Sequence, residues 1–411
     1  MRGESVIDAR QLSLTLRGKE WLRRFEDADR ELAELVLSAL TLVSHSEFER
    51  TLTAKIVDVA NQVEGPVALF ATREMESLDL YFKDSSSTTN AVAPGADLGS
   101  EARVTALIRN LAKAYSEKLL NHPSVDDMRA AKCRAIFAVD DFIGSGRRTA
   151  SFFTSMWKNL SLRSWHSLGL ISFWAVTYAA TEVGQRRVEN SRTGAKVRYA
   201  RDCPSFRNMP WRKSVQEAAL DLFRRYGKRT SKKHMALGYD QVATAIVFEH
   251  GCPNNNPAVF WAPSRPRSDW EPLFPQRSVL PTEASAFPPE IARREPTLVL
   301  LQAGQRRLSR SGALTRRGPI GTTILTVLGL AAQGIRSRAA IAYATGLAAG
   351  DITRILDRCV KWNFLTATLR LTPAGSAELR YAKSIDPIKN GVPPRGNDDY
   401  YPVQLRGPVD G

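Results

Sequence analysis

The chain has 411 residues, enough to bury more than one hydrophobic core, so two domains of ordinary size are expected. Apolar residues make up 43% of the sequence and exclude global disorder. No stretch approaches the roughly 20 uninterrupted apolar residues of a membrane helix, and the charged N-terminus is unlike a secretory signal. We therefore expect a cytoplasmic protein with no membrane partner.

The formal net charge is +16, and two regions hold much of the excess of basic residues. Residues 147–233 carry nineteen Lys or Arg against five acids, and residues 297–340 carry seven Arg against none. Self-repulsion of this size favours an anionic partner, with nucleic acid as the leading candidate and a solvated surface as the alternative. The four cysteines are far apart in the sequence, which indicates reduced thiols rather than disulfides or a metal site. They are Cys133, Cys203, Cys252 and Cys359.

The first half of the chain predicts helices and then alternating strands and helices. Apolar residues recur at three- and four-residue spacing over 17–62, so residues 1–62 are assigned to an N-terminal helical cap. A strand is predicted at 67–70, a mobile loop that covers a ligand at 83–100 and a helix at 101–120. Strands at 134–139 and 169–178 are each followed by a helical segment. This alternation predicts an α/β fold with a mostly parallel sheet over residues 63–275.

Two adjacent carboxylates, Asp140 and Asp141, follow the strand at 134–139 and precede a loop of small residues. The loop runs from Gly144 to Thr149, and we expect the next helix to begin at Ala150. A helix N-terminus offers unpaired amides and a positive dipole end to an anion, while glycines let the backbone approach a phosphate. Carboxylates can accept hydrogen bonds from a ribose diol or hold Mg²⁺ through water. The pattern fits a sugar 5-phosphate; an acidic turn that caps a helix is the alternative.

The order strand, Asp-Asp, three residues, Ser, Gly resembles the ribose-phosphate motif of type I phosphoribosyltransferases. The resemblance implies that fold, with Asp140 and Asp141 on the ribose hydroxyls and the loop around the 5-phosphate. The implied ligand is phosphoribosyl diphosphate or a nucleotide, with Mg²⁺ held by the two aspartates through water or substrate. Many purine-type members have a catalytic acid where this chain has Gly144, and the closing threonine is displaced by one residue to Thr149. These departures bear on base-specific transferase chemistry rather than on sugar-phosphate binding.

Flanking segments carry a narrower resemblance over residues 15–275. Ala71-Thr72-Arg73-Glu74 follows the first strand, where transferases of this fold hold pyrophosphate; Gly99-Ser100-Glu101 opens a helix; and the unusual run from His250 to Asn256 precedes Trp261. This set resembles the phosphoribosyltransferase-like proteins of bacterial conflict and antiphage loci, including some retrons. There they accompany a reverse transcriptase and its multicopy single-stranded DNA (msDNA), which are the partners that the resemblance implies.

The candidate site residues fall into three groups. The catalytic candidates are Asp140, Asp141, Arg73 and His250. The candidates for phosphate and ribose binding are Gly144, Ser145, Gly146, Arg147, Thr149 and Thr72. Asn254 and Asn255 are placed on a loop over the site, where His250 and the asparagines either contact a ligand or shape the loop. Arg73 either clamps a diphosphate or pairs with an acid such as Glu74.

The C-terminal third predicts an Arg- and Pro-rich linker at 276–318, a winged-helix domain at 319–384 and a tail at 385–411. Helices are expected at 320–333 and 338–345, then a tight turn, an amphipathic helix that begins near Ile352, and a wing hairpin over 366–371. This order resembles the winged-helix DNA-binding modules of bacterial regulators, although winged helices also dock on proteins. The candidate nucleic-acid contacts are Arg306, Arg307, Arg310, Arg316, Arg317, Arg354, Arg358 and Lys361.

Two functions remain open at this point. The first is a retron-type antiphage effector or accessory subunit that binds DNA or msDNA and acts on a ribosyl-phosphate or nucleotide, as a transferase or a nucleotide N-glycosyl hydrolase. The second is a non-enzymatic transcriptional regulator that senses a nucleotide and reads DNA. An ordinary salvage transferase needs neither the basic C-terminal domain nor the Arg-rich segment. A homo-oligomer is compatible with either function.

Overall fold

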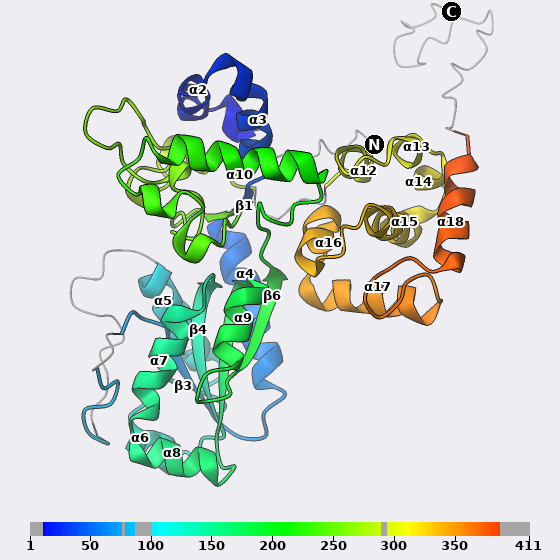
Figure 1. Cartoon of the computed structure of the whole chain (residues 1–411). Coiled ribbons are helices and arrows are strands. Elements are labelled where there is room, and N and C mark those ends of the chain that lie inside the picture. Colours follow the sequence, from blue (N-terminus) through cyan, green and yellow to red (C-terminus); the bar gives the residue numbers. More distant parts are fainter. Residues whose placement is uncertain (1–10, 76–78, 87–99, 289–293, 387–411) are drawn as a thin grey trace, which may run out of the picture.

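A computed structural model describes residues 11–75, 79–86, 100–288 and 294–386. They form a parallel sheet with helices on both faces, a hood of helices and loops beyond one end of the sheet, and a C-terminal group of helices beside them (Figure 1). The α/β fold class with a parallel sheet and flanking helices is confirmed. No helix in these ranges is long and apolar enough to cross a membrane.

The main sheet has the strand order β3-β2-β4-β5-β6, and all of its strands are parallel. Their bounds are β2 Val67–Ala71, β3 Leu119–Asn121, β4 Ala135–Ile143, β5 Ser172–Ala180 and β6 Lys196–Asp202. The central strand β4 is buried along its whole length, with Val139 opposite Ala71 of β2 and Asp140 opposite Thr177 of β5. Because the strands are parallel, their carboxyl ends share one edge of the sheet.

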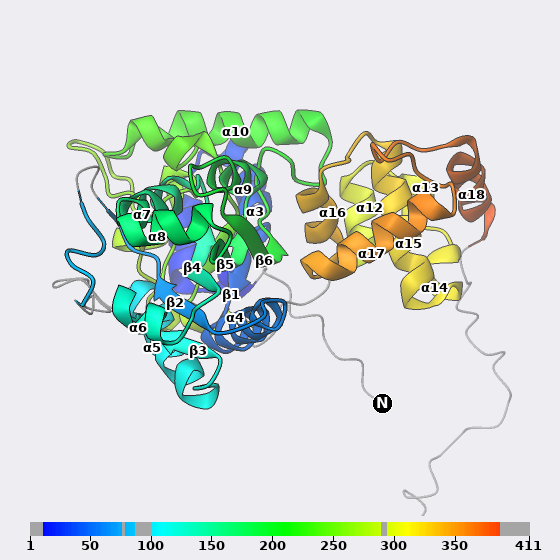
Figure 2. The same ribbon diagram turned by 90° about the horizontal axis from the view of Figure 1, so that it is seen from below.

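Helices cover both faces of this sheet, as Figure 2 shows from below. The helices α4 His45–Ala60 and α5 Ser100–Ala114 pack on the face that contains Phe137 and Val139. The opposite face, with Ile136 and Ala138, packs against α6 Val125–Ala130, α7 Arg147–Trp157, α8 Leu160–Ser167 and α9 Glu182–Glu189. Alternate residues of β4 therefore serve two separate cores, as the two-residue period of a strand requires.

The hood lies beyond the carboxyl ends of the strands, with α2, α3 and α10 at the top of Figure 1. Its helices are α1 Gln11–Leu14, α2 Leu16–Arg23, α3 Asp27–Ser38 and α10 Lys213–Gly227, with single-turn helices η1 Lys233–Met235, η2 Tyr239–Gln241, η3 Ala258–Phe260 and η4 Pro275–Arg277. Aromatic side chains dominate its core, where Trp21 stacks on Phe260 and meets Trp270 edge to face.

The N-terminal segment is not a separate cap, because it is shared between the hood and the sheet domain. Helix α4 packs on the main sheet, and β1 Thr41–Val43 pairs in parallel with β7 Ile246–Phe248. That pairing joins segments about two hundred residues apart, a long-range contact that helical periodicity cannot reveal. Part of the loop expected at 83–100 lies outside the described residues, and the helix expected at 101–120 is α5, which ends at Ala114.

The C-terminal helices are α15 Gly318–Ala332, α16 Arg338–Thr345, α17 Ala349–Lys361 and α18 Pro373–Ser384, and an antiparallel bridge between Leu365 and Leu371 forms the wing. This order agrees with the winged helix expected from the sequence. The segment expected as a linker contains α11 Pro281–Ala284, α12 Pro296–Gln302, α13 Arg306–Ser309 and α14 Ala313–Arg316. Val299, Leu300 and Leu308 are buried in the winged-helix core, so 296–316 is part of the folded C-terminal unit.

Candidate functional site

Asp140 and Asp141 lie at the carboxyl end of β4, with 3% and 7% of their surface exposed. The sequence analysis expected the strand to end at Val139, but it continues through both aspartates to Ile143, because the ladder with β5 continues to the pair Ile143 and Ala180. The two carboxylates are therefore held by a strand that is buried along its whole length, and Asp140 is paired with Thr177 of β5.

A guanidinium and an imidazole hold the two carboxylates. Arg148 Nη2 donates to Asp140 Oδ1 at 2.7 Å and approaches Asp141 Oδ1 at 3.5 Å. His250 Nε2 lies 3.1 Å from Asp141 Oδ2, and its ring stacks on Phe248 with centroids 5.0 Å apart. His250, which lies just after β7 and 109 residues beyond Asp141 in the sequence, is thus brought to the predicted site, and its side chain is only 3% exposed.

These contacts divide the two carboxylates into unlike groups. Burial raises the pKa of Asp140 well above its ordinary value, and the charge of Arg148 only partly opposes this. Burial acts on Asp141 in the same sense, but the hydrogen bond from His250 and the charge of Arg148 outweigh it, so the pKa of Asp141 lies below its ordinary value. The Asp140 carboxylate in turn raises the pKa of Arg148. Asp141 is therefore the more readily ionised member of the pair, and it accepts a hydrogen bond from His250 Nε2–H.

Three buried polar atoms at this edge have no hydrogen-bond partner among the described residues. They are Thr72 Oγ1, Asp140 Oδ2 and His250 Nδ1. Thr72 directly follows β2, and its backbone N–H donates to Val139 O at 2.8 Å, so Thr72 and Asp140 occupy adjacent positions on neighbouring strands. Buried polar groups are normally hydrogen-bonded, so these three atoms keep the capacity to bind water or a ligand at this edge.

The loop after β4 brings small residues against the hood and against α9. Gly146 has a φ of +76° and forms the N-cap of α7, which begins at Arg147 and not at Ala150 as expected, because the left-handed glycine lets the chain turn into the helix immediately. A Cβ on Gly144 would lie 2.1 Å from Asn255 Oδ1, and one on Gly146 would lie 2.5 Å from Gly184 O. At Gly146 the contact is with backbone and φ is positive, so only glycine fits there, whereas a side chain at position 144 would displace Asn255.

The hood and α9 close over the same loop through Asp240. Its carboxylate oxygen Oδ2 accepts from Arg147 Nε at 2.8 Å and from Arg187 Nη1 at 2.7 Å. Arg187 Nη1 also donates to Ser145 O. Asn255, predicted over the site, donates from Nδ2 to Tyr239 O at 3.1 Å, while Asn254 O accepts from Tyr239 N. The two asparagines therefore hold the hood segment that carries Asp240 beside the loop.

The remaining predicted site residues lie around this centre. Arg73 follows Thr72, and its guanidinium stacks over Tyr81 at 4.7 Å from the ring centroid. Next to it, His122 Nε2 accepts from Ala71 N at 2.9 Å, and burial, with the charge of Arg73, lowers the pKa of His122 to about 4. Thr149 is buried in the first turn of α7. The residues predicted to bind ribose and phosphate therefore lie at the carboxyl ends of β2 and β4, at the start of α7, or in the hood beyond them.

The donor set bears on how Mg²⁺ would be held. Among the described residues no three His, Cys, Asp or Glu side chains are grouped closely enough to hold a metal ion. Asp140 Oδ2 nevertheless remains a buried carboxylate oxygen without a protein partner. This set fits a cation that arrives on the oxygens of a diphosphate and meets Asp140 directly or through water, rather than one held by the protein alone.

Sequence reasoning missed Arg148, Arg187 and Asp240. Arg148 lies in the loop predicted from Gly144 to Thr149, and its place seven residues after Asp141, at the start of α7, could have suggested the contact. Arg187 and Asp240 lie some forty and ninety residues beyond the loop and carry no local pattern. Only the tertiary fold brings them to it.

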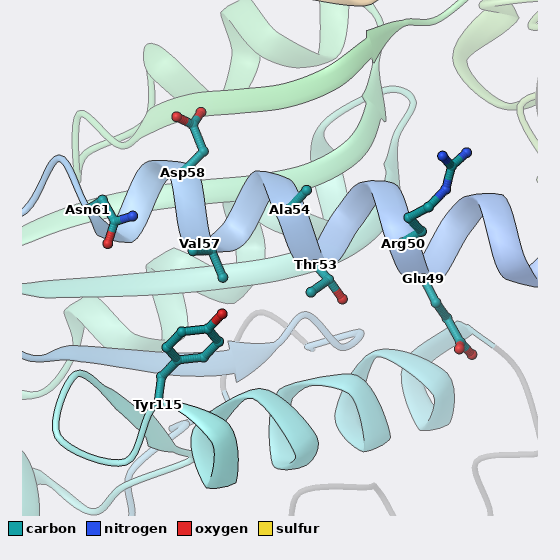
Figure 3. A pocket seen from close by; sticks show the side chains of 8 residues that line it. All are labelled: Glu49, Arg50, Thr53, Ala54, Val57, Asp58, Asn61 and Tyr115. Atoms are coloured by element: carbon teal, nitrogen blue, oxygen red, sulfur yellow. The ribbon is translucent and has the colours of Figure 1, made fainter.

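An open hollow of about 610 Å³ lies elsewhere on this domain, between α4 and the end of α5 (Figure 3). Its lining comprises Glu49, Arg50, Thr53, Ala54, Val57, Asp58, Asn61 and Tyr115. Two of its charged side chains pair with residues outside it, Glu49 with Arg103 and Arg50 with Glu47. None of the candidate site residues lines the hollow, so it takes no part in the site at the sheet edge.

The predicted nucleic-acid residues are not brought together. Arg306, Arg307, Arg310, Arg316 and Arg317 belong to α13, α14 and the turns after them, whereas Arg354, Arg358 and Lys361 lie on α17. In Figure 1, α13 and α17 are on opposite sides of α15 and α16. The C-terminal unit therefore carries two separate sets of basic side chains.

Comparison with known families agrees with this geometry. A family model described as PRTase-CE matches residues 19–276, which is more than half of the chain. The chain belongs to the PRTase-CE family. A second model, described as wHTH-PRTase associated, matches residues 325–407, and the two together support a phosphoribosyltransferase-like domain with a C-terminal winged helix. Neither the curated proteins nor the solved structures compared with the chain give a match.

Proposed function

We propose that the PRTase-CE domain binds a phosphorylated ribose, as phosphoribosyl diphosphate with Mg²⁺ or as a nucleotide, and that the protein acts in bacterial antiphage defence in association with nucleic acid. The observation that carries the ligand assignment is the pair of unpartnered buried oxygens, Thr72 Oγ1 and Asp140 Oδ2, at adjacent positions beside a glycine loop that opens a helix.

Each part of the site matches one part of such a ligand. Asp140 and Asp141 accept hydrogen bonds from the ribose hydroxyls, and the amides from Ser145 to Arg147 receive the 5-phosphate at the start of α7. Thr72 and Arg73, after β2, face a pyrophosphate or the far side of the sugar. Mg²⁺, when bound with a diphosphate, would neutralise charge on its leaving oxygens.

His250 and Asp141 are the residues through which chemistry would proceed. With Nε2–H donating to the ionised Asp141, a neutral His250 keeps a lone pair on Nδ1, which can accept a proton. That arrangement suits substitution or hydrolysis at the anomeric carbon better than base-specific transfer, because Gly144 replaces the acid of many purine-type transferases.

Titration calorimetry tests the ligand assignment. Phosphoribosyl diphosphate with Mg²⁺, ribose 5-phosphate and AMP are compared with unphosphorylated ribose, for wild type, Asp140→Asn and the matched control Asp357→Asn on the exposed face of α17. We expect binding of at least one phosphorylated ligand, a loss of tenfold or more, about 1.4 kcal/mol, in Asp140→Asn, and no change in the control. Equal affinity of Asp140→Asn and wild type would overturn the assignment.

A second candidate, a nucleotide sensor that regulates DNA binding, is favoured by one observation. The last residue of β6, Asp202, accepts from Arg338 Nε of α16 at 3.0 and 3.1 Å, so the sheet that carries the site contacts the winged helix directly. Chromatography of reaction mixtures separates the two candidates. Release of base or pyrophosphate that Asp140→Asn abolishes identifies an enzyme, whereas binding without turnover that alters DNA affinity identifies a sensor.

The defence role rests on the family resemblance and is tested in cells. The intact locus, with its reverse transcriptase gene if one adjoins, is challenged with phage, and plaque counts are compared between wild type and Asp140→Asn. Wild-type protection that the variant lacks supports the role. If neither the wild type nor the variant protects the cells, the defence role is refuted, while the proposed ligand binding is unaffected.

A further inference from the structure

Helix α17 occupies the position of the helix that reads DNA in helix-turn-helix proteins. Its outward face carries little net charge. Its basic residues Arg354, Arg358 and Lys361 are exposed, but Asp351 and Asp357 lie on the same helix. Arg354 pairs with Asp351, and Arg358 lies over Trp362 with 5.6 Å to the ring centroid. The net charge of these five side chains is only +1, from three cations and two anions.

The first turn of α17 is also occupied by contacts within the protein. Arg338 Nη1 donates to Thr353 Oγ1 at 2.7 Å, and its other terminal nitrogen donates to Ala349 O, while its Nε is held by Asp202 of β6. Arg201 Nη1 of β6 adds a hydrogen bond to Gly346 O at 3.1 Å, in the turn before α17. The first residues of a recognition helix normally approach the bases, and here they serve the contact between domains.

The other side of the C-terminal unit has the opposite character. Arg306, Arg307, Arg310 and Arg316 are exposed on α13, α14 and the turn between them, and none of the four makes an ion pair within the described residues. Beside them, burial and the charge of Arg307 lower the pKa of Lys383 on α18. We name these four arginines the arginine face; the helices α13 and α14, which carry them, lie above α15 in Figure 1, and α17 lies below it.

An aromatic side chain lies beside Arg317, which follows Arg316 of the arginine face in the sequence. Tyr381 of α18 is 60% exposed, and Arg317, which follows α14, lies 5.7 Å from its ring centroid while pairing with Glu378. Exposed aromatic rings beside guanidiniums are the platform on which unpaired bases stack, whereas the bases of a duplex are not available for such stacking. The arginine face therefore combines phosphate-binding charge with a base-stacking ring.

We propose that single-stranded nucleic acid binds the arginine face, with its phosphates on Arg306, Arg307, Arg310 and Arg316 and a base on Tyr381, while α17 serves as the contact to the PRTase-CE domain. This inference rests on the proposed association with nucleic acid and specifies its surface and its partner. Since the contacts are to phosphates and to the flat face of a base, binding is expected to show little sequence preference.

Fluorescence anisotropy with labelled oligothymidylate and a labelled duplex tests the proposal on the full-length protein. The variant R306Q/R307Q/R310Q/R316Q, which removes four charges, is compared with R354Q/R358Q/K361Q, which removes three from α17. All replaced side chains are exposed, so circular dichroism should show unchanged folding. We expect the first set to lose tenfold or more in affinity for oligothymidylate and about three in the salt slope, at roughly 0.7 per lost phosphate contact. The α17 set should stay within about twofold of wild type.

Tyr381→Ala tests whether the nucleic acid bound is single-stranded. It should weaken oligothymidylate binding by about fivefold or more, at about 1 kcal/mol or more per stacked base, and leave duplex binding unchanged. Loss in the α17 set with retention in the arginine set, or equal effects of Tyr381→Ala on both probes, would overturn the proposal. Failure of wild type to bind either probe at low salt would refute the nucleic-acid association itself. That failure would not affect the proposed ligand site at Asp140, which calorimetry tests separately.

Discussion

Arg148 is expected to be the residue on which the buried aspartates depend most, and Arg148→Gln tests this. The substitution removes the one guanidinium that touches both carboxylates, whose side chains are 3% and 10% exposed. Loss of one partner from a buried ion pair costs about 3–5 kcal/mol. Because 36% of the Arg148 side chain is in solvent, we expect a smaller loss of unfolding free energy than this, about 2–3 kcal/mol near pH 8.

The loss should depend on pH, and its sign follows from Asp140. Without Arg148 the pKa of Asp140, already raised by burial, rises further because Asp141 remains ionised beside it. A carboxyl group whose folded pKa is raised contributes most stability below its unfolded pKa and loses it as pH rises through the folded pKa. The variant should therefore recover part of the lost stability as the pH falls from 8 toward 5, because lower pH favours the neutral form of Asp140.

Urea unfolding followed by tryptophan fluorescence measures the stability of the PRTase-CE domain, in which Arg148 lies. Seven of the eight tryptophans lie before residue 276, so the signal reports mainly on the PRTase-CE domain. Arg163→Gln, an exposed arginine of α8, is the matched control and should be neutral at both pH values. A loss that is equal at pH 5 and pH 8, or no loss at pH 8, would refute the assignment of Arg148 as the counter-charge of the pair.

Two further outcomes are expected. His122 has its pKa lowered to about 4 by burial and by Arg73, so it stabilises the fold above its unfolded pKa of about 6.5, and that stability falls as pH drops from 6.5 toward 4. His122→Asn, which suits the φ of +46°, should flatten this dependence of the urea midpoint; an unchanged slope would contradict it. Gly146→Ala should cost more unfolding free energy than Gly169→Ala and weaken ligand binding, because both have positive φ but only at Gly146 would a Cβ clash, 2.5 Å from Gly184 O. Equal losses in the two variants would show that the contact with Gly184 is unimportant.

The core of the site was predictable because its signals are local in the sequence. An apolar run, two aspartates, two glycines and a helix start are consecutive, and a parallel sheet places such a run at its carboxyl edge whatever the rest of the chain does. The end of the strand was wrong by four residues because the length of β4 is set by its ladder with β5. The start of α7 was wrong by three residues because it depends on the left-handed φ of Gly146.

The residues that close the site were not predictable for a different reason. Asp240 holds Arg147 and Arg187 together, yet neither its neighbours nor its spacing from the loop differ from those of an ordinary surface acid. His250 was selected as part of an unusual run, but its contact with Asp141 depends on β7, whose partner β1 lies two hundred residues earlier. Such contacts are decided by topology, and a single sequence does not encode topology in a readable pattern.

In the C-terminal unit, too, the sequence did not reveal how the basic residues are arranged in space. The sequence places the basic residues of α13, α14 and α17 within one predicted domain, and a helix-turn-helix pattern then directs all of them to one ligand. Helix α15 lies between the two sets in Figure 1, and its second half is buried because α12, α14, α16 and α18 all pack against it. The helices that surround a buried helix present their charged residues away from it. We therefore chose the proposed anion-binding surface by the number of arginines without an ion pair among the described residues, and on that criterion α13 and α14 rank above α17.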